Sequence, residues 1–427
     1  MTVTVQELRT FLGGSAKAAG MVHDLKDMGK FAFIRLRMAD GVIQCVYNYG
    51  EERVRPRHEQ AVVITGELVE EPRSPHGFEL RAEEITVLSE PASEAPDLIK
   101  SRVKTGLEAD LKYRAASLRN DRRRAAFRIQ AALAGAFRAY LAGNGFTEIF
   151  SPKIVAGSAE GGANIFKLEY FGQKAFLAQS PQFYKQTLVP AFLRVFEIAP
   201  VFRAEKHDTP RHLNEYISVD FEMGFIESFR DVCEMERGML SYAFDYLREN
   251  CADSLSALKC ELPEVGEIPY VTFREAKERV AERFGRRIKD PHDLEPEEER
   301  LISQMFKEDT GSDFVFVTHY PDKKRPFYAK NCAEDPKLTE SFDLLYKGME
   351  ITTGGQRIHD YDEQTAKMER KGLVPADFES FLQMHKYGAP PHGGLGMGLE
   401  RLCMKLFDDD NIRWDSMFPR DTGRLAP

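Results

Sequence analysis

Two predicted strands joined by a polar loop, between Phe202 and Phe225, constrain the fold of this chain more than any other stretch. The stretch is FRAEKHDTPRHLNEYISVDFEMGF, whose second strand carries Asp220 and Glu222 between apolar neighbours. Alternation of apolar and charged residues is typical of a half-exposed strand. In a buried sheet, charged side chains are stable only when something balances them. This hairpin therefore predicts either a solvated strand pair or a sheet that holds a charged group.

Composition indicates a globular protein of two unequal domains. The 427 residues are enough for a large core and a smaller second domain. The net charge of −9 disfavours non-specific binding to polyanions. No apolar run of about 18 residues is present, so we expect no membrane span.

The cysteines and the amino-terminal residues predict a cytoplasmic protein. The start, MTVTVQELRTFL, lacks the basic region and apolar core of an export signal. The six cysteines are scattered and form no CxxC pair. This spacing favours reduced thiols over a disulfide framework or a zinc site.

Residues 1–92 are rich in short predicted strands. Two are expected over residues 31–37 and 42–47, next to turns that contain glycine, and QAVVITGELVEE and GFELRAEEITVLSE supply two more. Five short strands in a meander predict a small barrel, and an OB-fold fits this size. An SH3-like barrel and a β-sandwich fit the same pattern. Residues 93–120, which begin near a segment rich in Pro, Ser and acidic residues, are expected to form a linker or hinge.

Residues 121–427 are expected to form an α+β domain. Apolar residues from Phe127 to Leu141 recur near helical spacing, which predicts one long helix over 121–144. Strands and helices then follow in mixed order without a repeated βαβ unit, which favours an antiparallel sheet over a Rossmann-type sheet. The chain contains neither GxxxxGK[ST] nor a strand–GxGxxG–helix fingerprint, so any nucleotide must be held differently.

Three further regions combine chemically active residues with backbone that lets a ligand approach closely. GSAEGGANIF places Glu160 before two glycines, and AQSPQFYKQ places Gln182 and Lys185 three residues apart at the start of a helix. In the C-terminal half, GMEITTGGQRIHD and GLGMGLERL place arginines beside a strand and in the first turn of a helix. Taken singly, each region also fits an ordinary loop, cap or close-packed helix entry.

Taken together, these motifs resemble those of the class II aminoacyl-tRNA synthetases. Pro152 in FTEIFSPKI is similar to the first motif of that class, the hairpin to its second and GLGMGLERL to its third. The resemblance covers almost the whole chain and includes the barrel, because the aspartate–asparagine–lysine subgroup has an OB-fold anticodon-binding domain. It implies that residues 1–92 form this OB-fold barrel. Residues 121–427 would then form a class II catalytic domain, with an antiparallel sheet flanked by helices.

Within this subgroup, SPQFYKQ, FDLLYKGMEITTGGQRIHD and the ending FPRDTGRLAP resemble archaeal-type aspartyl enzymes. Lys185 and Arg357 would pair with a side-chain carboxylate but would match a neutral amide poorly. The implied reaction is ATP-dependent attachment of L-aspartate to tRNA through an aspartyl-adenylate. The alternatives are an asparaginyl-tRNA synthetase, a tRNA-independent asparagine synthetase-like paralogue and a non-catalytic nucleic-acid-binding paralogue.

The resemblance implies three catalytic residues, Arg203, Glu350 and Arg401. Arg203 is expected to bridge the α-phosphate and the amino-acid carboxylate, Arg401 to clamp the pyrophosphate, and Glu350 with Thr353 to bind Mg²⁺, which prefers oxygen ligands. Phe221 is expected to lie close to the ATP. The residues implied for ATP are Arg203, Ala204, Glu205, Arg211, His212, Leu213, Glu350, Gly398, Leu399, Glu400 and Arg401. Those implied for aspartate are Glu160, Gln182, Phe183, Tyr184, Lys185, Arg203, Thr353 and Arg357.

The resemblance also implies that the barrel binds the tRNA anticodon. Phe33 is similar to the aromatic residue that stacks on an anticodon base, and Gln44 to a polar residue that contacts the middle base. His23 and Pro75 stand where enzymes accepting both tRNA-Asp and tRNA-Asn tend to carry His and Pro, whereas aspartate-only archaeal enzymes tend to carry Trp and Lys. The hypothesis is therefore relaxed tRNA specificity. The first motif further implies a homodimer.

Overall fold

The computed structural model describes residues 1–49, 54–100, 103–157 and 164–426. Contacts within the chain divide it into two units. One unit comprises residues 1–106 and 115–121, and the other comprises residues 107–114 and 122–427. The segment expected to be a linker, 93–120, contains short helices. These are η2 (Asp97–Ile99), α2 (Leu107–Lys112) and α3 (Arg114–Ser117).

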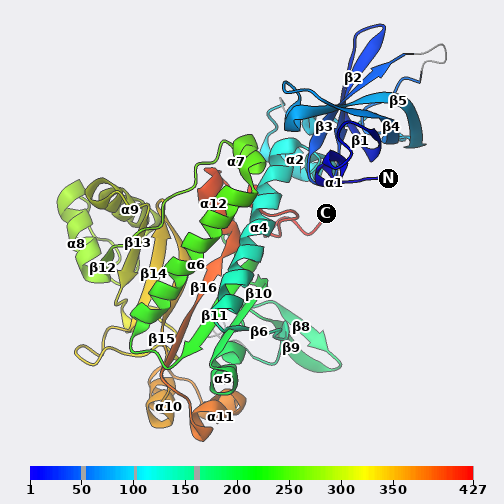
Figure 1. The fold of residues 1–427 in the computed structure, drawn as a ribbon. Coiled ribbons are helices and arrows are strands. Elements are labelled where there is room, and N and C mark those ends of the chain that lie inside the picture. The colour runs from blue at the N-terminus through cyan, green and yellow to red at the C-terminus, as the bar shows by residue number, and fades with distance from the viewer. Residues whose placement is uncertain (50–53, 101–102, 158–163, 427) are drawn as a thin grey trace. The chain divides into compact units, whose positions relative to one another are not determined.

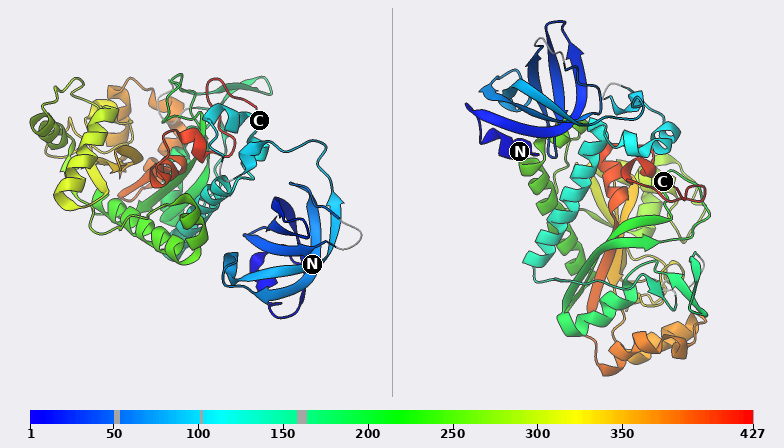
Figure 2. Two further views of the ribbon diagram at one scale, coloured as in Figure 1. Left: turned by 90° about the horizontal axis from the view of Figure 1, so that it is seen from above. Right: turned by 90° about the vertical axis from the view of Figure 1, so that its right-hand side faces the viewer.

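The first unit is a closed barrel of five strands in the order β1-β2-β3-β5-β4, which confirms the expected barrel. Figure 2 shows these strands curving round a common centre. In β2, Ala32, Ile34 and Leu36 are fully buried, whereas Phe31 and Phe33 alternate with them at half-buried positions. The unit begins with helix α1 (Val5–Arg9). Its strands are β1 (Ser15–Asp27), β2 (Phe31–Arg37), β3 (Val42–Asn48), β4 (Ala61–Glu70) and β5 (Phe78–Ser89).

The second unit is built on an eight-stranded sheet in the order β12-β13-β14-β15-β16-β11-β10-β6. Its strands pair antiparallel except at the two ends, where β12 pairs with β13 and β6 with β10 in parallel. The expected antiparallel sheet is therefore confirmed. A smaller sheet has the order β7-β9-β8. The strands are β6 (Thr147–Glu148), β7 (Ile154–Val155), β8 (Lys167–Tyr170), β9 (Gln173–Leu177), β10 (Arg194–Phe202), β11 (Glu215–Gly224), β12 (Tyr270–Thr272), β13 (Phe314–Thr318), β14 (Ser341–Tyr346), β15 (Met349–Gln356) and β16 (His392–Gly398).

Helices α4 and α6 lie across one face of the large sheet (Figure 1). Phe137 of α4 and Phe244 of α6 are buried in one apolar core with Phe196 and Leu395 of the sheet, as expected for helices with one apolar face. The long helix expected over 121–144 is α4. The helices are α4 (Asp121–Gly143), α5 (Gln182–Phe192), α6 (Phe229–Asn250), α7 (Ala252–Leu258), α8 (Phe273–Phe284), α9 (Pro296–Thr310), α10 (Tyr361–Arg370), α11 (Glu379–Tyr387) and α12 (Leu399–Phe407). Across the described ranges, no helix has both the length and the apolar character needed to cross a membrane.

The hairpin expected from the sequence is formed by β10 and β11, and β11 lies against a glycine-rich strand. Gly394 of β16 is the register partner of Glu222. A Cβ atom on Gly394 would lie 2.1 Å from the carbonyl oxygen of Phe221 and 2.3 Å from the Glu222 carboxylate. Both distances are far shorter than van der Waals contact. Only glycine therefore fits at this position, and its absent side chain is what lets the Glu222 carboxylate lie against the sheet.

We expect Gly394→Ala to destabilise the second unit by about 3 kcal/mol, because overpacking must displace backbone here. Gly135→Ala, on the exposed side of α4 where a Cβ atom would meet nothing within 4 Å, should instead stabilise the protein by up to about 1 kcal/mol. Urea unfolding followed by circular dichroism would measure both changes. Equal stability of Gly394→Ala and the wild type would contradict the close approach.

Candidate active site

A charged pocket lies on the face of the sheet away from α4 and α6. Alternation along β11 directs Phe221 into the apolar core and Asp220 into the pocket. This corrects the expectation for Phe221, which is fully buried and lies 5.4 Å from Phe146 between ring centroids. The basic side chains that line the pocket are Lys185, Arg203, Arg211, Arg325, Arg357 and Arg401. The acidic ones are Glu205, Asp220, Glu350 and Glu400.

Four buried charges form an array at one end of this site: Lys185, Asp220, Glu222 and Arg357, which are between 0% and 6% exposed. Lys185 Nζ lies 2.9 Å from Asp220 Oδ1 and 3.5 Å from Glu222 Oε2. Arg357 Nε donates to Glu222 Oε1 at 2.9 Å, and its Nη2 donates to the Gly394 carbonyl at 2.8 Å. Burial raises the pKa of Glu222, but Arg357 and Lys185 outweigh this effect and hold the pKa below its usual value. The acids of the hairpin therefore neutralise buried cations.

Helix α5 brings Gln182 to the same end of the pocket. Gln182 is 4% exposed, and its Nε2 has no hydrogen-bond partner among the described residues. A buried N–H group without an acceptor is costly unless a ligand supplies one, so Gln182 is suited to bind a substrate oxygen. Ser180 Oγ accepts from the Gln182 backbone N–H at 3.2 Å, while the helix itself begins at Gln182 with Pro181 as its N-cap.

Two neighbours on α5 that were implied for aspartate point elsewhere. Phe183 packs against Phe381, with ring centroids 4.8 Å apart, in an apolar cluster that α10 and α11 help to form. Among the described residues, the pocket lining includes Gln182 and Lys185 but neither Phe183 nor Tyr184. Successive residues of a helix point about 100° apart, which explains the division.

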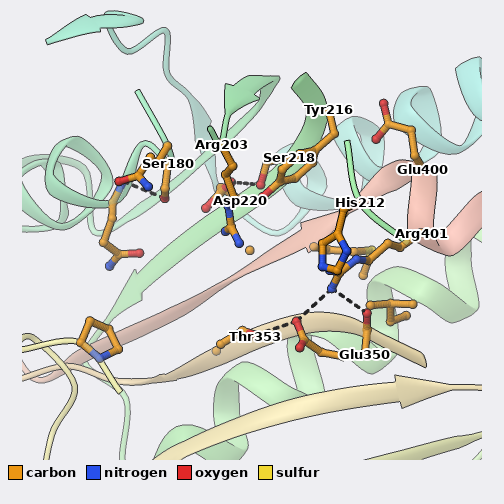
Figure 3. A pocket seen from close by; sticks show the side chains of 18 of the residues that line it. Ser180, Arg203, His212, Tyr216, Ser218, Asp220, Glu350, Thr353, Glu400 and Arg401 are labelled. Carbon is orange, nitrogen blue, oxygen red and sulfur yellow. Dashed lines mark hydrogen bonds and ion pairs between the residues drawn. The ribbon is translucent and has the colours of Figure 1, made fainter. Parts of the chain in front are cut away.

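The loop of the hairpin, residues 203–214, forms a second wall. Arg203 extends beside Asp220 into the pocket (Figure 3), and its guanidinium carbon lies 5.5 Å from the centre of the Tyr216 ring. Asn214 Nδ2 donates to the carbonyls of Arg203 and Glu205 at 2.7 and 3.0 Å. These bonds hold the two sides of the loop together at its base.

Farther along this loop, His212 and Leu213, which the resemblance implies for ATP, line the pocket. His212 Nε2 lies 3.6 Å from Glu205 Oε2. Burial lowers the pKa of His212 and outweighs the opposite effect of Glu205, so the imidazole is largely neutral at pH 7. A neutral imidazole beside Arg401 can accept or donate a hydrogen bond without adding charge.

Glu350 and Thr353 of β15 meet Arg401 of α12 (Figure 3). Thr353 Oγ1 and Arg401 Nη1 both donate to Glu350 Oε1, at 3.1 and 3.2 Å. Burial raises the pKa of Glu350, but Arg401 and Arg325 bring it below its usual value, so the carboxylate is ionised. Asp343 is the register partner of Thr353, and burial raises its pKa to about 6. These carboxylate and hydroxyl oxygens are the ligands that Mg²⁺ prefers.

Among the described residues, two of the remaining four implied for ATP, Gly398 and Glu400, line the pocket, and two, Leu399 and Ala204, do not. Gly398 is the N-cap of α12, and the Glu400 carboxylate accepts from the Ile217 N–H at 3.0 Å, which fixes the start of the helix against β11. Leu399 is 3% exposed in the apolar core, and the backbone N–H of Ala204 donates to Asn164 at 2.9 Å. In the described part of the chain, neither of these last two residues lines the pocket. Glu160, implied for aspartate, lies outside the described residues.

Sequence analysis missed a group that lines the pocket between β13 and β14. Arg325 Nη2 lies 2.8 Å from Asp343 Oδ1, and its guanidinium carbon is 3.9 Å from the centre of the Tyr320 ring. Tyr328 belongs to the same segment and also lines the pocket. The sequence PDKKRPFY resembles a solvated basic turn, and the one available signal was an arginine followed by proline and two aromatic residues.

On the barrel, three of the residues implied for the anticodon lie at half-buried or exposed positions. The Phe33 ring on β2 packs edge-to-face against the Phe31 ring, with ring centroids 5.3 Å apart. Gln44 Nε2 donates to Glu79 Oε2 at 2.9 Å, and Pro75 is exposed at the start of the short helix η1 (Pro75–Gly77).

The fourth residue, His23, is buried at an irregularity in the pairing of β1 with β2 and is 3% exposed. Its Nε2 lies 3.1 Å from Asp121 Oδ2, and its Nδ1 lies 3.1 Å from Arg37 Nη1. Arg37 in turn donates to both oxygens of the Glu59 carboxylate, at 2.8 and 2.7 Å. Any influence of His23 on a bound tRNA must therefore pass through its neighbours.

Two known protein families match two separate stretches of the chain. Residues 106–422 match the family described as "tRNA synthetases class II (D, K and N)". The chain belongs to the class II aminoacyl-tRNA synthetases. Residues 16–88 match the family described as "OB-fold nucleic acid binding domain", which confirms the nature of the barrel.

Relatives within this family match along the full chain. A protein of Deinococcus radiodurans named "Aspartate--tRNA(Asp/Asn) ligase" is 44% identical, covering 99% of this chain and 98% of its own length. A protein of Thermus thermophilus with the same name is 42% identical, covering 100% of both. The structure of asparaginyl-tRNA synthetase from Pyrococcus horikoshii with asparaginyl-adenylate superposes with a TM-score of 0.91 at 30% identity, covering 100% of both chains.

A buried acid on α6, hydrogen-bonded to β15, should make stability depend on pH. Glu236 of α6 is fully buried, and Thr352 Oγ1 donates to its Oε1 at 2.6 Å. Burial raises its pKa from 4.5 to about 8. The folded state then binds more protons than the unfolded state between these values, so stability falls as pH rises from about 5 to 8.

We expect Glu236→Gln to be more stable than the wild type at pH 8 and to lose part of the pH slope, which is at most about 1.4 kcal/mol per pH unit for one such group. Glu400 and Glu299, whose pKa values burial also raises, to about 8 and about 7, should retain part of the slope. Chemical unfolding at several pH values would measure this. Glu234→Gln, a change on the same helix at a side chain that is 56% exposed, is the control. An unchanged slope in Glu236→Gln would contradict the prediction.

Proposed function

We propose that this synthetase attaches L-aspartate to tRNA through an aspartyl-adenylate in an ATP-dependent reaction. The observation that carries the proposal is the buried array around Lys185 and Arg357, together with Gln182 Nε2, which has no hydrogen-bond partner within the described ranges. The array is neutral overall, since Asp220 and Glu222 balance its two cations. Apart from its α-carboxylate, which Arg203 would hold, aspartate brings an ammonium and a side-chain carboxylate, and these two charges preserve that balance. Asparagine would bring the ammonium alone and leave an excess positive charge in a buried site.

The first step joins two anions. An oxygen of the aspartate α-carboxylate attacks the α-phosphorus of ATP, the bond from that phosphorus to the bridging oxygen breaks, and pyrophosphate leaves. Positioning and positive charge are the main demands on the protein. Arg203 would hold the carboxylate against the α-phosphate, while Arg211 and Arg401 would hold the outer phosphates. No general base is needed, because the nucleophile is already ionised.

A divalent cation fits beside these arginines. Glu350, Thr353 and Asp343 offer oxygen ligands, and we assign Mg²⁺ to this group. Bound there, Mg²⁺ would neutralise charge on the phosphates. In the second step, the terminal ribose hydroxyl of tRNA attacks the adenylate carbonyl carbon and AMP leaves.

We further propose that both tRNA-Asp and tRNA-Asn are accepted. The two relatives described above carry names with both tRNAs. On the barrel, Phe33 and Gln44 are suited to stacking and hydrogen bonding with anticodon bases. Exposed Pro75 has no side-chain donor, and buried His23 shapes the strand pair that carries Phe33. Neither offers a contact that would discriminate the third anticodon base, at which the two tRNAs differ.

The main alternative is an asparaginyl-tRNA synthetase, which the likeness to the Pyrococcus horikoshii structure favours. That likeness covers a fold that the aspartyl and asparaginyl enzymes share, whereas the charge balance of the array favours aspartate. A tRNA-independent asparagine synthetase-like paralogue would have no use for the nucleic-acid-binding barrel that is present here.

The experiment that tests the proposal is aminoacylation with aspartate or asparagine against purified tRNA-Asp and tRNA-Asn. We expect aspartate to be attached to both tRNAs and asparagine to neither above background. Preferential use of asparagine would establish the asparaginyl alternative. Charging of an unmodified tRNA-Asn transcript at less than a hundredth of the rate for tRNA-Asp would refute the relaxed specificity while leaving the aspartyl activity in place. Aspartate-dependent pyrophosphate exchange without charging of either tRNA would favour the paralogue.

We also propose that the protein is a cytoplasmic homodimer. Phe150, within the first motif, is 87% exposed, and Phe171, in the turn between β8 and β9, is 91% exposed. The family resemblance places the subunit interface at the first motif, so these exposed rings are the ones that we expect a second copy of the chain to cover. The six cysteines are all free, which suits a reducing compartment.

We expect the wild type to have about twice the mass of the 48.6 kDa chain in light scattering coupled to size exclusion. The double variant Phe150→Asp with Phe171→Asp should shift to the mass of a monomer, because charge would be buried without a partner in the interface. Tyr387→Asp, at a position that is 83% exposed on α11, should leave the mass unchanged. A wild type that is monomeric at micromolar concentration would refute the dimer.

A further inference from the structure

Glu299 of helix α9 joins two parts of the nucleotide site without lining the pocket itself. Its Oε2 accepts a hydrogen bond from Arg211 Nη2 of the hairpin loop. The same oxygen accepts from the backbone N–H of Glu350 at 3.2 Å. Glu299 is 7% exposed, and the side chain of Arg211 is 19% exposed. A single buried carboxylate therefore connects the loop of the hairpin to the start of strand β15.

Arg211 faces the pocket, and Glu299 lies behind it. Arg211 is part of the pocket lining, whereas in the described part of the chain no residue of α9 is. A guanidinium has five N–H donors in a planar fork, and the bond to Glu299 engages only one of its two terminal nitrogens. The remaining donors are left to bind a ligand in the pocket.

The backbone of this loop is held separately from the Arg211 side chain. The Ile412 N–H donates to the Pro210 carbonyl at 2.9 Å, and Arg413 Nη1 donates to the Thr209 carbonyl at 3.2 Å. Removing the Glu299 charge should therefore release the side chain of Arg211 while the course of the loop is kept. This separation makes the role of Glu299 testable.

We propose that Glu299 is a positioning residue that orders the Arg211 side chain for the triphosphate of ATP. The inference rests on the function proposed above, in which Arg211 contacts ATP. An arginine side chain has many rotamers, and fixing it before the ligand arrives removes an ordering cost from binding. A charged acceptor also holds the guanidinium more firmly than a neutral one. Glu299 thus acts through Arg211, without touching ATP.

The test compares Glu299→Gln with Glu297→Gln in aspartate-dependent pyrophosphate exchange. Burial raises the pKa of Glu299 to about 7, so the exchange is measured at pH 8, where the wild-type side chain is largely ionised. Glutamine retains the size and an acceptor oxygen but loses the charge. We expect Glu299→Gln to raise the KM for ATP about tenfold and to change the KM for aspartate by less than twofold. Glu297 lies on the same helix, is 46% exposed in its side chain and pairs with Arg300 at 2.7 Å, so Glu297→Gln should change neither constant.

A double-mutant comparison separates positioning from a general structural role. In an Arg211→Ala background, Glu299→Gln should raise the KM for ATP no further, because the side chain that it positions is gone. The same increase in both backgrounds, an unchanged KM for ATP in Glu299→Gln, or a lowered one would overturn the proposal. Melting temperature is measured alongside. If Glu299→Gln does not fold, Glu299→Asp replaces it, because the shorter side chain withdraws the carboxylate from Arg211, and it should also raise the KM for ATP in the wild-type background and not in the Arg211→Ala background. Absence of aspartate-dependent exchange in the wild type would instead refute the proposed function.

Discussion

The site depends on four charges that are buried together, Lys185, Asp220, Glu222 and Arg357. A buried ion is stable only when its counterion and hydrogen-bond partners stand at the correct distance, since the loss of water is not otherwise offset. These partners come from α5, from β11 and from the residue that follows β15. The array therefore requires the hairpin, the helix and the centre of the sheet to keep one arrangement. It makes one end of the pocket rigid before any substrate arrives.

Strand β11 meets this requirement because one of its faces lies in the charged site and the other lies in the apolar core. Asp220 and Glu222 face the charged site, while Phe221 between them packs into the core under α4 and α6. The same strand must also approach β16 closely, and Gly394 provides the space. A change that shifted β11 by one residue would place its acids in the apolar core and its aromatic ring in the site. The register of this strand is consequently fixed from both faces.

Sequence patterns were sufficient where structure follows from local periodicity. The strands of the barrel, the helix α4 and the hairpin were each predicted close to their observed ranges, because period two and period 3.6 are local signals. The family resemblance located Arg203, Glu350 and Arg401, which the pocket does bring together. Local patterns did not reveal which way Phe221 points, nor that Arg325 would enter the pocket. Both outcomes depend on distant elements that compete for the same face.

The two ends of the pocket differ in how their charges are balanced. The end around Lys185 and Arg357 is neutralised internally, so a ligand bound there is stable only if it preserves that balance. At the other end, Arg203, Arg211 and Arg401 are only partly buried, and Arg211 and Arg401 pair with Glu299 and Glu350. A triphosphate bound there would accept from the guanidinium N–H groups that these pairs do not use. A buried, neutral array at one end and partly exposed arginines at the other suit the proposed reaction, which must bring two anions into contact, because the array selects the first anion by charge balance and the arginines offer donors and positive charge to the second.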